Sequence, residues 1–276
     1  MEQTASLRDV TGTLVLAGAG KMGSALLDGW LARGLDPAAV VVLEPQPSLQ
    51  VGRYASLGLR LNPGDAAIRA DAIIVAVKPQ VAPEVLPGLA SFINPATVVV
   101  SIMAGRSLAF LQSALPTATA IVRTMPNTPA AIGRGITVAI GNAHVTARQK
   151  ELADRLLAAT GGVEWIGDEG LMDAVTAVSG SGPAYVFLLA EALARAGRAA
   201  GLPEALAARL ARATIAGSGE LLGRASEDAA TLRRNVTSPG GTTAAALGVL
   251  MAPDGLETLM EKAVGAATRR SRELDV

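Results

Sequence analysis

The chain has 276 residues, of which 50% are hydrophobic and 3% aromatic, and its 24 acidic residues balance its 24 basic residues. This balance leaves no basic excess that would indicate a nucleic-acid partner. The sequence has no cysteine and its only histidine is His144, which excludes disulfides, thiolate metal sites, cysteine nucleophiles and histidine-rich metal sites.

Location is predicted from two stretches of the sequence. Residues Met1–Thr13 are polar and mixed in charge, unlike the apolar run of a signal peptide. The longest apolar helical stretch, Ala184–Ala194, is interrupted by Glu191 and is too short to span a bilayer. We therefore expect a cytoplasmic protein that does not enter a membrane. The lack of cysteine and the single histidine also lead us to expect no metal site.

The first half of the chain alternates short apolar runs with helical patterns. Its Val and Ile runs, bounded by Gly, Pro and Asp, are typical of parallel strands covered on both faces. A helix from about Met22 to Arg33, ended by Gly34, follows the first strand. This alternation predicts an α/β doubly wound sheet. The predicted strands are Thr13–Ala17, Val40–Leu43, Ala72–Val77, Thr97–Ser101, Ile121–Arg123, Ile136–Ile140 and Val163–Ile166.

The character of the sequence changes after Gly167, and no strand is predicted beyond that residue. Helices are predicted at Tyr185–Ala200, Pro203–Leu222 and Leu256–Glu273, with proline in the first turn of the second. Abundant alanine suits close packing of these helices. We therefore predict a sheet domain over 1–167 and an all-helical domain over 168–276.

A glycine-rich motif, Gly18-Ala19-Gly20-Lys21-Met22-Gly23, lies between the first strand and the first helix. In this G-x-G-x-x-G pattern the first glycine makes the tight turn and the second lets a pyrophosphate approach the backbone. The third allows the helix to pack on the strand. The strand–motif–helix context predicts dinucleotide binding.

Polar residues also follow the other predicted strands, where ligands bind in open α/β sheets. Glu44 ends the second strand, where an acid would bind the ribose 2′-hydroxyl and repel a 2′-phosphate, which favours NADH over NADPH; alternatively it is a solvated loop acid. Lys78 is a candidate cofactor contact or a surface charge. Asn127 carries an amide suited to nicotinamide or substrate, or forms a turn between two prolines.

The segment Ser238-Pro239-Gly240-Gly241-Thr242-Thr243 leads into an apolar helical pattern, Ala244–Met251. Two glycines leave its backbone N–H groups accessible, and a helix N-terminus favours an anion such as a carboxylate. The alternative is an ordinary loop with a threonine cap.

The available side chains restrict the chemistry of a nicotinamide enzyme. The four lysines are Lys21, Lys78, Lys150 and Lys262, so none lies between Gly162 and Met251. His144 lies in a polar loop and is interpreted as a surface residue. The region between Gly162 and Met251, which should supply the substrate site, therefore offers neither a lysine nor a histidine acid, and this indicates a substrate that needs little proton assistance. An iminium carbon is such a substrate.

Taken together, the motifs resemble those of pyrroline-5-carboxylate reductases, the last enzymes of proline biosynthesis. The resemblance covers nearly the whole length and rests on GAGKMG (18–23), AVKPQ (76–80), SIMAG (101–105), RTMPNTPA (123–130), VSGSGPAYVF (178–187) and NVTSPGGTT (235–243). It implies a Rossmann domain followed by a helical dimerisation domain, whose dimers assemble in many members into decamers. It also implies that NADPH or NADH reduces the C=N bond of 1-pyrroline-5-carboxylate to give L-proline.

The resemblance also implies roles for individual residues. Thr243 corresponds to the hydroxyl proposed to hydrogen-bond the ring nitrogen, and Glu169 to a position near the substrate. The implied substrate-binding residues are Glu169, Asn235, Ser238, Gly240, Gly241, Thr242 and Thr243. The cofactor-binding residues, together with those read from the strand ends, are Ala17, Gly18, Ala19, Gly20, Lys21, Met22, Glu44, Val77, Lys78, Pro79, Ile102, Ala104 and Asn127.

The sequence departs from the family pattern at two places. Glu44 stands where many members carry Ser, Thr or Asn, often followed by Arg for a 2′-phosphate, and Asp228-Ala229 replaces a common His-Pro pair. Two other classes stay open. A β-hydroxyacid dehydrogenase shares the two-domain plan, but Tyr185–Glu191 lacks its catalytic lysine. A non-catalytic nucleotide sensor or scaffold would have no need for the 238–243 loop to bind proline.

Overall fold

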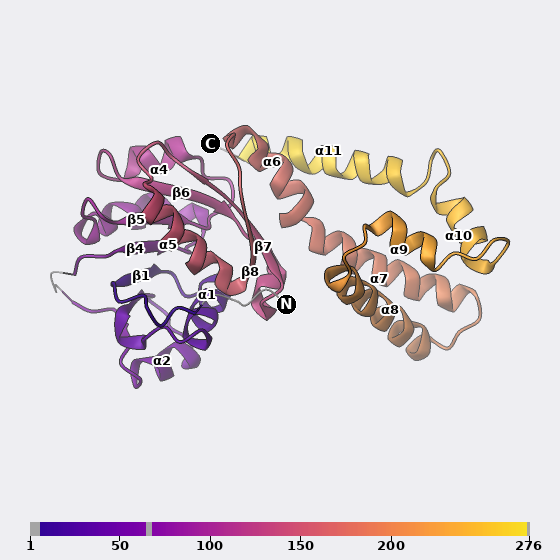
Figure 1. Ribbon diagram of the computed structural model, residues 1–276, viewed down its shortest axis with the longest axis horizontal. Coiled ribbons are helices and arrows are strands. Elements are labelled where there is room, and N and C mark those ends of the chain that lie inside the picture. The colour runs from indigo at the N-terminus through magenta and orange to yellow at the C-terminus, as the bar shows by residue number, and fades with distance from the viewer. Residues whose placement is uncertain (1–5, 65–67, 275–276) are drawn as a thin grey trace. The chain divides into compact units, whose positions relative to one another are not determined.

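The computed structural model describes residues 6–64 and 68–274 (Figure 1). The start of the polar segment Met1–Thr13 and the last two residues of the predicted helical domain lie outside the described residues. Two compact units make up the chain. The first reaches Gly180 and includes the chain from Thr268 onward, and the second is Ser181–Ala267.

The first unit contains an eight-stranded sheet in the order β3-β2-β1-β4-β5-β6-β7-β8. The register places Ala17 beside Leu43 and Val75, and Val75 beside Ser101. The predicted doubly wound α/β class is confirmed. The strands are β1 Leu14–Ala17, β2 Val40–Leu43, β3 Arg60–Leu61, β4 Ala72–Val75, β5 Val98–Ser101, β6 Ala120–Met125, β7 Gly135–Gly141 and β8 Gly161–Trp165.

The prediction of parallel strands is wrong for one pairing. Strand β7 runs antiparallel to β6, with Val122 opposite Gly141. Only the short 3-10 turn Thr128–Ile132 lies between these strands. A parallel pair needs a crossover of about a dozen residues or more, usually through a helix, so this short connection returns the chain antiparallel.

Alternate strand residues point into two separate cores, one on each face of the sheet. Trp30 of α1 is fully buried in the first core, and its indole N–H donates to the Leu156 carbonyl at 2.8 Å. The first face is covered by α1 Lys21–Ala32, α2 Leu49–Ala55 and α5 Ala147–Leu157. The second is covered by α3 Ala82–Val85, the 3-10 helix Leu86–Phe92, α4 Leu108–Ala114 and α6 Met172–Val175.

The compact sheet unit continues past the domain boundary predicted at Gly167. Met172 of α6 is 1% exposed and belongs to the second core, and Ala177 in the π-helical turn Thr176–Gly180 is fully buried. These two apolar side chains keep the chain packed on the sheet unit until Gly180.

The second unit is helical throughout. Helices α7 and α8 form a hairpin in which Gly201 takes a φ of +99°, a left-handed conformation that ends a helix at little cost for glycine. The helices are α7 Gly182–Ala199, α8 Glu204–Arg224, α9 Ala229–Asn235, α10 Thr242–Leu250 and α11 Leu256–Leu274, the last of which returns to the first unit.

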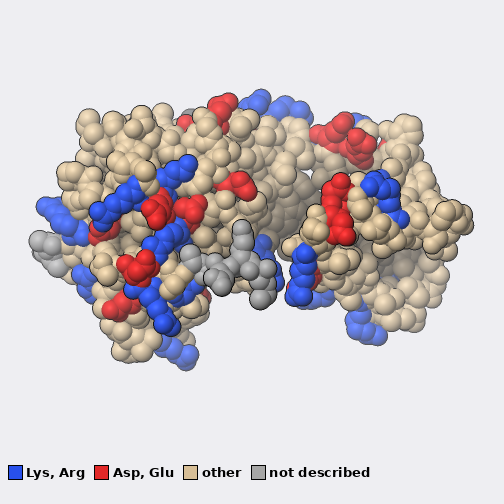
Figure 2. Space-filling model, viewed as in Figure 1, with Lys and Arg blue, Asp and Glu red and all other residues tan. Residues whose placement is uncertain are grey.

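Large apolar side chains on α7 and α8 remain exposed in the single chain. Phe187 is 62% exposed, Leu188 57% and Leu221 56%. Several large apolar side chains exposed on the same helix indicate a site of interaction. Over the face drawn in Figure 2, acidic and basic side chains are interspersed.

The prediction that the longest apolar helical stretch is too short for a bilayer is wrong by length and composition. The helical run Glu169–Ala199 is long and apolar enough to cross a membrane, and 6% of its apolar window is buried in the chain. This run is longer than the predicted stretch Ala184–Ala194 because the helical turns over 169–180 lead directly into α7. A helix buried by protein passes the same test, so this is weak evidence for a membrane.

Candidate active site

The sheet changes winding direction between β1 and β4, which are neighbours although β2 and β3 separate them in sequence. From this point the strand order proceeds outward on both sides. Ligands of open α/β sheets bind at such a switch point, outside the carboxyl ends of the strands. The segments after β1, β2, β4 and β5 therefore emerge together at one edge, and they carry most of the predicted cofactor residues.

The three motif glycines have distinct surroundings. Gly18 has a φ of +93°, and a Cβ there would lie 2.7 Å from the Ala76 carbonyl oxygen. A Cβ on Gly23 would lie 2.2 Å from the Gly18 carbonyl oxygen, so both positions require glycine. A Cβ on Gly20 would meet nothing within 4 Å. Open space in front of Gly20, at the start of α1, fits the approach of a pyrophosphate.

Glu44 does not behave as a solvated loop acid. Its Oε2 accepts a hydrogen bond from the Ala19 N–H at 2.8 Å, and its Oε1 accepts from the Gln46 N–H at 3.0 Å. Glu44 thereby joins the end of β2 to the glycine-rich motif. Lys21 and Met22 lie in the first turn of α1, which begins at Gly20 without a side-chain cap or an acidic residue. Its N-terminal N–H groups therefore favour an anion.

Arg106, a residue that the sequence analysis did not identify, joins the segment after β5 to the segment after β4. Its guanidinium donates to the Pro79 carbonyl at 3.0 Å and lies 4.6 Å from the centre of the Phe110 ring. Lys78 is exposed immediately before Pro79, beside half-buried Val77. The loop after β5 places Ile102 and exposed Ala104 at the same edge of the sheet. The Ile102 N–H donates to the Val75 carbonyl at 3.1 Å.

Asn127 has a structural partner. Its Oδ1 accepts a hydrogen bond from the Ile136 N–H at 3.0 Å, which holds the start of β7 against the preceding turn. This hydrogen bond supports the interpretation of Asn127 as a turn-forming residue.

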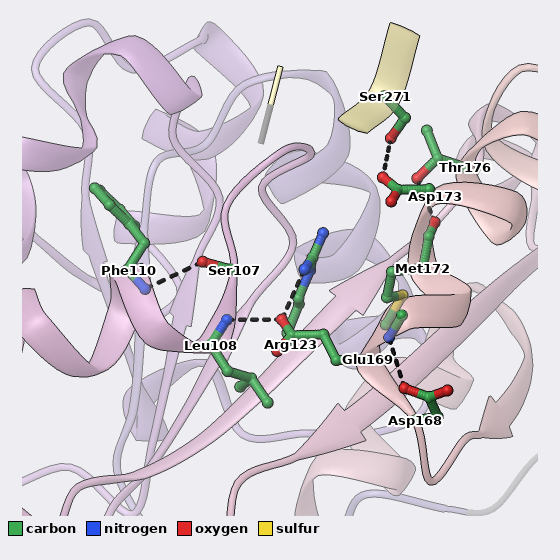
Figure 3. Close-up of polar contacts among 11 residues, drawn as sticks. Ser107, Leu108, Phe110, Arg123, Asp168, Glu169, Met172, Asp173, Thr176 and Ser271 are labelled. Carbon is green, nitrogen blue, oxygen red and sulfur yellow. Dashed lines mark hydrogen bonds and ion pairs between the residues drawn. The ribbon is translucent and has the colours of Figure 1, made fainter. Parts of the chain in front are cut away.

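An ion pair between a buried arginine and a half-buried glutamate joins β6 to the segment after β8 (Figure 3). The Arg123 guanidinium donates to Glu169 Oε1 at 2.6 Å, and the Leu108 N–H donates to the same oxygen at 2.8 Å. The side chain of Arg123 is 7% exposed and that of Glu169 31%. Glu169, which was predicted near the substrate, thus caps α4 and pairs with a residue to which the sequence analysis gave no role.

Replacing Glu169 with alanine should destabilise the first unit. The variant leaves the buried Arg123 guanidinium and the Leu108 N–H without this carboxylate, a loss of about 2 kcal/mol in the free energy of unfolding after allowance for partial exposure. Urea unfolding measures the loss.

Two controls accompany this substitution. Glu169→Gln keeps an acceptor oxygen and should lose less stability. Glu273→Ala breaks the exposed Arg270–Glu273 pair and should change stability by about 0.5 kcal/mol or less. Equal stability of Glu169→Ala and wild type would contradict a structural role for the pair.

The predicted substrate loop lies in the second unit. Gly240 has a φ of +68°, and the Gly241 N–H donates to the Ser238 carbonyl at 3.0 Å, so the segment forms a tight Pro-Gly turn. Gly241 is the N-cap of α10 and provides no side-chain cap. Thr242 is exposed and Thr243 half-buried in the first turn, while Asn235, the last residue of α9, is exposed.

The replacement of the common His-Pro pair by Asp228-Ala229 has a local structural explanation. Asp228 is the N-cap of α9, and its Oδ1 accepts from the Thr231 N–H at 2.6 Å. This backbone hydrogen bond lowers the pKa of the Asp228 carboxyl below its usual value. The aspartate therefore starts the helix that leads to Asn235.

No group of three or more acidic or histidine side chains able to hold a metal ion occurs within 6–64 and 68–274. The structure brings Ala17–Met22, Glu44, Val77–Pro79, Ile102 and Ala104 to one edge of the sheet. This fold and site define a Rossmann-type nicotinamide oxidoreductase with a separate helical unit.

Comparison with known proteins identifies the family. The chain belongs to the pyrroline-5-carboxylate reductase family. Residues 169–274 match the family model "Pyrroline-5-carboxylate reductase dimerisation", and residues 13–105 match "NADP oxidoreductase coenzyme F420-dependent".

Relatives and solved structures agree with this assignment. The chain is 40% identical to a pyrroline-5-carboxylate reductase of Pseudomonas aeruginosa, over 96% of this chain and 97% of that protein. It is 42% identical to one of Synechocystis, over 95% and 97%. The structure of the reductase from Coxiella burnetii superimposes with a TM-score of 0.88 at 33% identity, covering 96% of this chain and 99% of that one.

Family membership decides between the classes that the sequence left open. The β-hydroxyacid dehydrogenase and the non-catalytic scaffold are both set aside in favour of a pyrroline-5-carboxylate reductase. The exposed apolar side chains of α7 and α8 lie within residues 169–274, the region that matches the dimerisation model of the family.

Proposed function

We propose that this protein reduces the C=N bond of 1-pyrroline-5-carboxylate to L-proline with a nicotinamide dinucleotide, as the last step of proline biosynthesis. The observation that carries the proposal is the similarity to pyrroline-5-carboxylate reductases along 96% of the chain. The open space at Gly20 and the uncapped start of α1 support the cofactor part of the proposal. The dinucleotide supplies the hydride.

The substrate carboxylate is assigned to the turn Ser238–Gly241 and the first turn of α10. The N-terminal N–H groups of that helix and the hydroxyls of Thr242 and Thr243 are suited to an anion. Ser238, Gly240 and Asn235 complete the proposed substrate contacts of the second unit, while Glu169, also predicted near the substrate, belongs to the first unit. Thr243 orients the ring nitrogen, since an unperturbed hydroxyl is a poor acid.

Most of the catalytic effect is assigned to positioning. Residues 163–250 contain no lysine or histidine to donate a proton. A protonated cyclic imine is already electrophilic at carbon and does not need such a donor. Holding this carbon against the nicotinamide supplies several kcal/mol of barrier reduction.

The choice of cofactor is assigned to Glu44. Its carboxylate is held at the end of β2 beside the glycine-rich motif, where it accepts a ribose hydroxyl and repels a 2′-phosphate. No Lys or Arg directly follows Glu44, and the first basic residue after it is Arg53 in α2. We therefore propose NADH as the preferred cofactor, with NADPH as the alternative that the family model's name suggests.

Oxidation of the cofactor, followed at 340 nm with pyrroline-5-carboxylate, tests both proposals. We expect turnover with both cofactors and a higher kcat/KM with NADH. Glu44→Ser should lower the ratio of NADH to NADPH kcat/KM by about tenfold, because it removes the repulsion of the 2′-phosphate.

The control for this variant is Glu151→Ser, an exposed acid of α5 that should leave the ratio unchanged. A wild-type preference for NADPH that Glu44→Ser does not alter would keep the reaction and remove the role of Glu44. Absence of turnover from folded protein would contradict the reaction itself.

The assembly is proposed to be a dimer through the region 169–274, with decamers as a larger form. Exposed apolar side chains on α7 and α8 support this contact surface. We assign the enzyme to the cytoplasm, where neither nucleic acid nor a membrane is a partner.

A further inference from the structure

Asn62, at the end of the short strand β3, makes an unusual set of contacts to the residue proposed to choose the cofactor. Its Oδ1 accepts from the Glu44 N–H at 2.9 Å, and its Nδ2 donates to the Glu44 carbonyl at 2.8 Å. The Asn62 N–H donates to the Val42 carbonyl at 2.8 Å. One amide therefore binds both polar groups of the Glu44 backbone.

The conformation of Asn62 makes this geometry available. Its φ is +44°, in the left-handed region, where asparagine is among the few residues other than glycine that are tolerated. Aspartate would keep the acceptor oxygen but lose the N–H donor, so only the asparagine amide makes both hydrogen bonds to Glu44. β3 contains only Arg60 and Leu61, and Asn62 extends its connection to β2 by side-chain bonds.

Glu44 transmits this constraint to the glycine-rich motif. With its backbone held by Asn62, its carboxylate accepts from the Ala19 N–H at 2.8 Å. The Gly18 N–H donates to the Leu43 carbonyl at 2.8 Å, which fixes the adjoining part of the motif. A chain of hydrogen bonds thus runs from Asn62 through Glu44 to Ala19.

We infer that Asn62 is a positioning residue that sets dinucleotide choice by holding the Glu44 carboxylate on the Ala19 N–H. This inference rests on the proposed role of Glu44 in favouring NADH. A carboxylate fixed in this way stays where a 2′-phosphate would have to lie. Without Asn62 the backbone of Glu44 loses two hydrogen bonds, its carboxylate is held less firmly on the Ala19 N–H, and discrimination against NADPH falls.

Calorimetric titration of the full chain with NADH and with NADPH provides the test. Asn62→Gly removes the amide, and glycine adopts the positive φ without strain. We expect the NADPH-to-NADH ratio of Kd to fall about fivefold or more in Asn62→Gly, and to change less than about twofold when the same substitution is added to Glu44→Ser. Amide hydrogen exchange of Ala19 should accelerate in both single variants.

Asn94→Ala is the matched control. Asn94 also makes two side-chain amide bonds, from the Ala96 N–H at 2.8 Å and to the Ala70 carbonyl at 3.1 Å, ahead of the amino end of β5. Its loss should leave the ratio of Kd unchanged.

An unchanged ratio in Asn62→Gly, while Glu44→Ser shifts it, would overturn the inference and leave the role of Glu44 intact. An equal shift in the Glu44→Ser background would overturn action through Glu44. No shift in Glu44→Ser would overturn the proposed role of Glu44 in cofactor choice, and the positioning role of Asn62 with it.

Discussion

Replacing Thr243 with valine is expected to lower kcat/KM for pyrroline-5-carboxylate more than tenfold. A tenfold loss corresponds to about 1.4 kcal/mol of transition-state stabilisation. Valine has the shape of threonine without its hydroxyl, and the two have similar helix propensities, so α10 is retained. The half-buried Thr243 lies in the first turn of that helix, after the Ser238–Gly241 turn. Steady-state kinetics at saturating cofactor give the value.

The specificity of this effect is judged from two further variants. Thr243→Ser keeps a hydroxyl and should retain most of the activity. Thr242→Val removes the neighbouring, exposed hydroxyl and should cost less than Thr243→Val. The Kd for NADH should be unchanged in all three variants. An unchanged kcat/KM in Thr243→Val would discard the polar role of this residue.

Gly20→Ala is expected to weaken dinucleotide binding by about tenfold or more while leaving the protein folded. Gly20 has a φ of −67°, which alanine adopts readily, and a Cβ there meets nothing within 4 Å in the protein. The added methyl group therefore enters only the space that a pyrophosphate needs. Calorimetric titration with NADH measures the loss, and thermal unfolding checks the fold.

Two glycine variants bracket this result. Gly52→Ala, in α2, also adds a methyl group with nothing within 4 Å and should leave NADH affinity unchanged. Gly23→Ala places Cβ 2.2 Å from the Gly18 carbonyl oxygen and should lower stability as well as binding. Wild-type affinity in folded Gly20→Ala would contradict pyrophosphate binding at this glycine.

The secondary structure of the sheet unit was largely predictable because its signals are local. Val40–Leu43 was predicted with the bounds that the structure has, and Leu14–Ala17 within one residue. Fully buried strands are continuous apolar runs, so their positions follow from composition. The two-residue strand β3 carries no such run, and the sequence analysis missed it.

The candidate site was predictable where backbone geometry dictates a residue type. Gly18 and Gly23 must be glycine because other backbone atoms occupy the position of a Cβ. The assigned roles of Thr243, Glu169 and the substrate loop stay predictions that the variants above address. Arg106, Arg123 and Asn62 were missed because each acts through a hydrogen bond to a residue distant in sequence.

The sequence by itself determined the class of the sheet, the position of the glycine-rich turn and the motifs that identify the family. Each depends on residues close together in the chain, where sterics and apolar periodicity restrict the backbone. Only the tertiary structure decided that β7 runs antiparallel, that Glu44 accepts from Ala19, and that Glu169 pairs with buried Arg123. These partners are brought together by strand order and packing, because a hydrogen bond depends on distance and direction in space and not on separation along the chain.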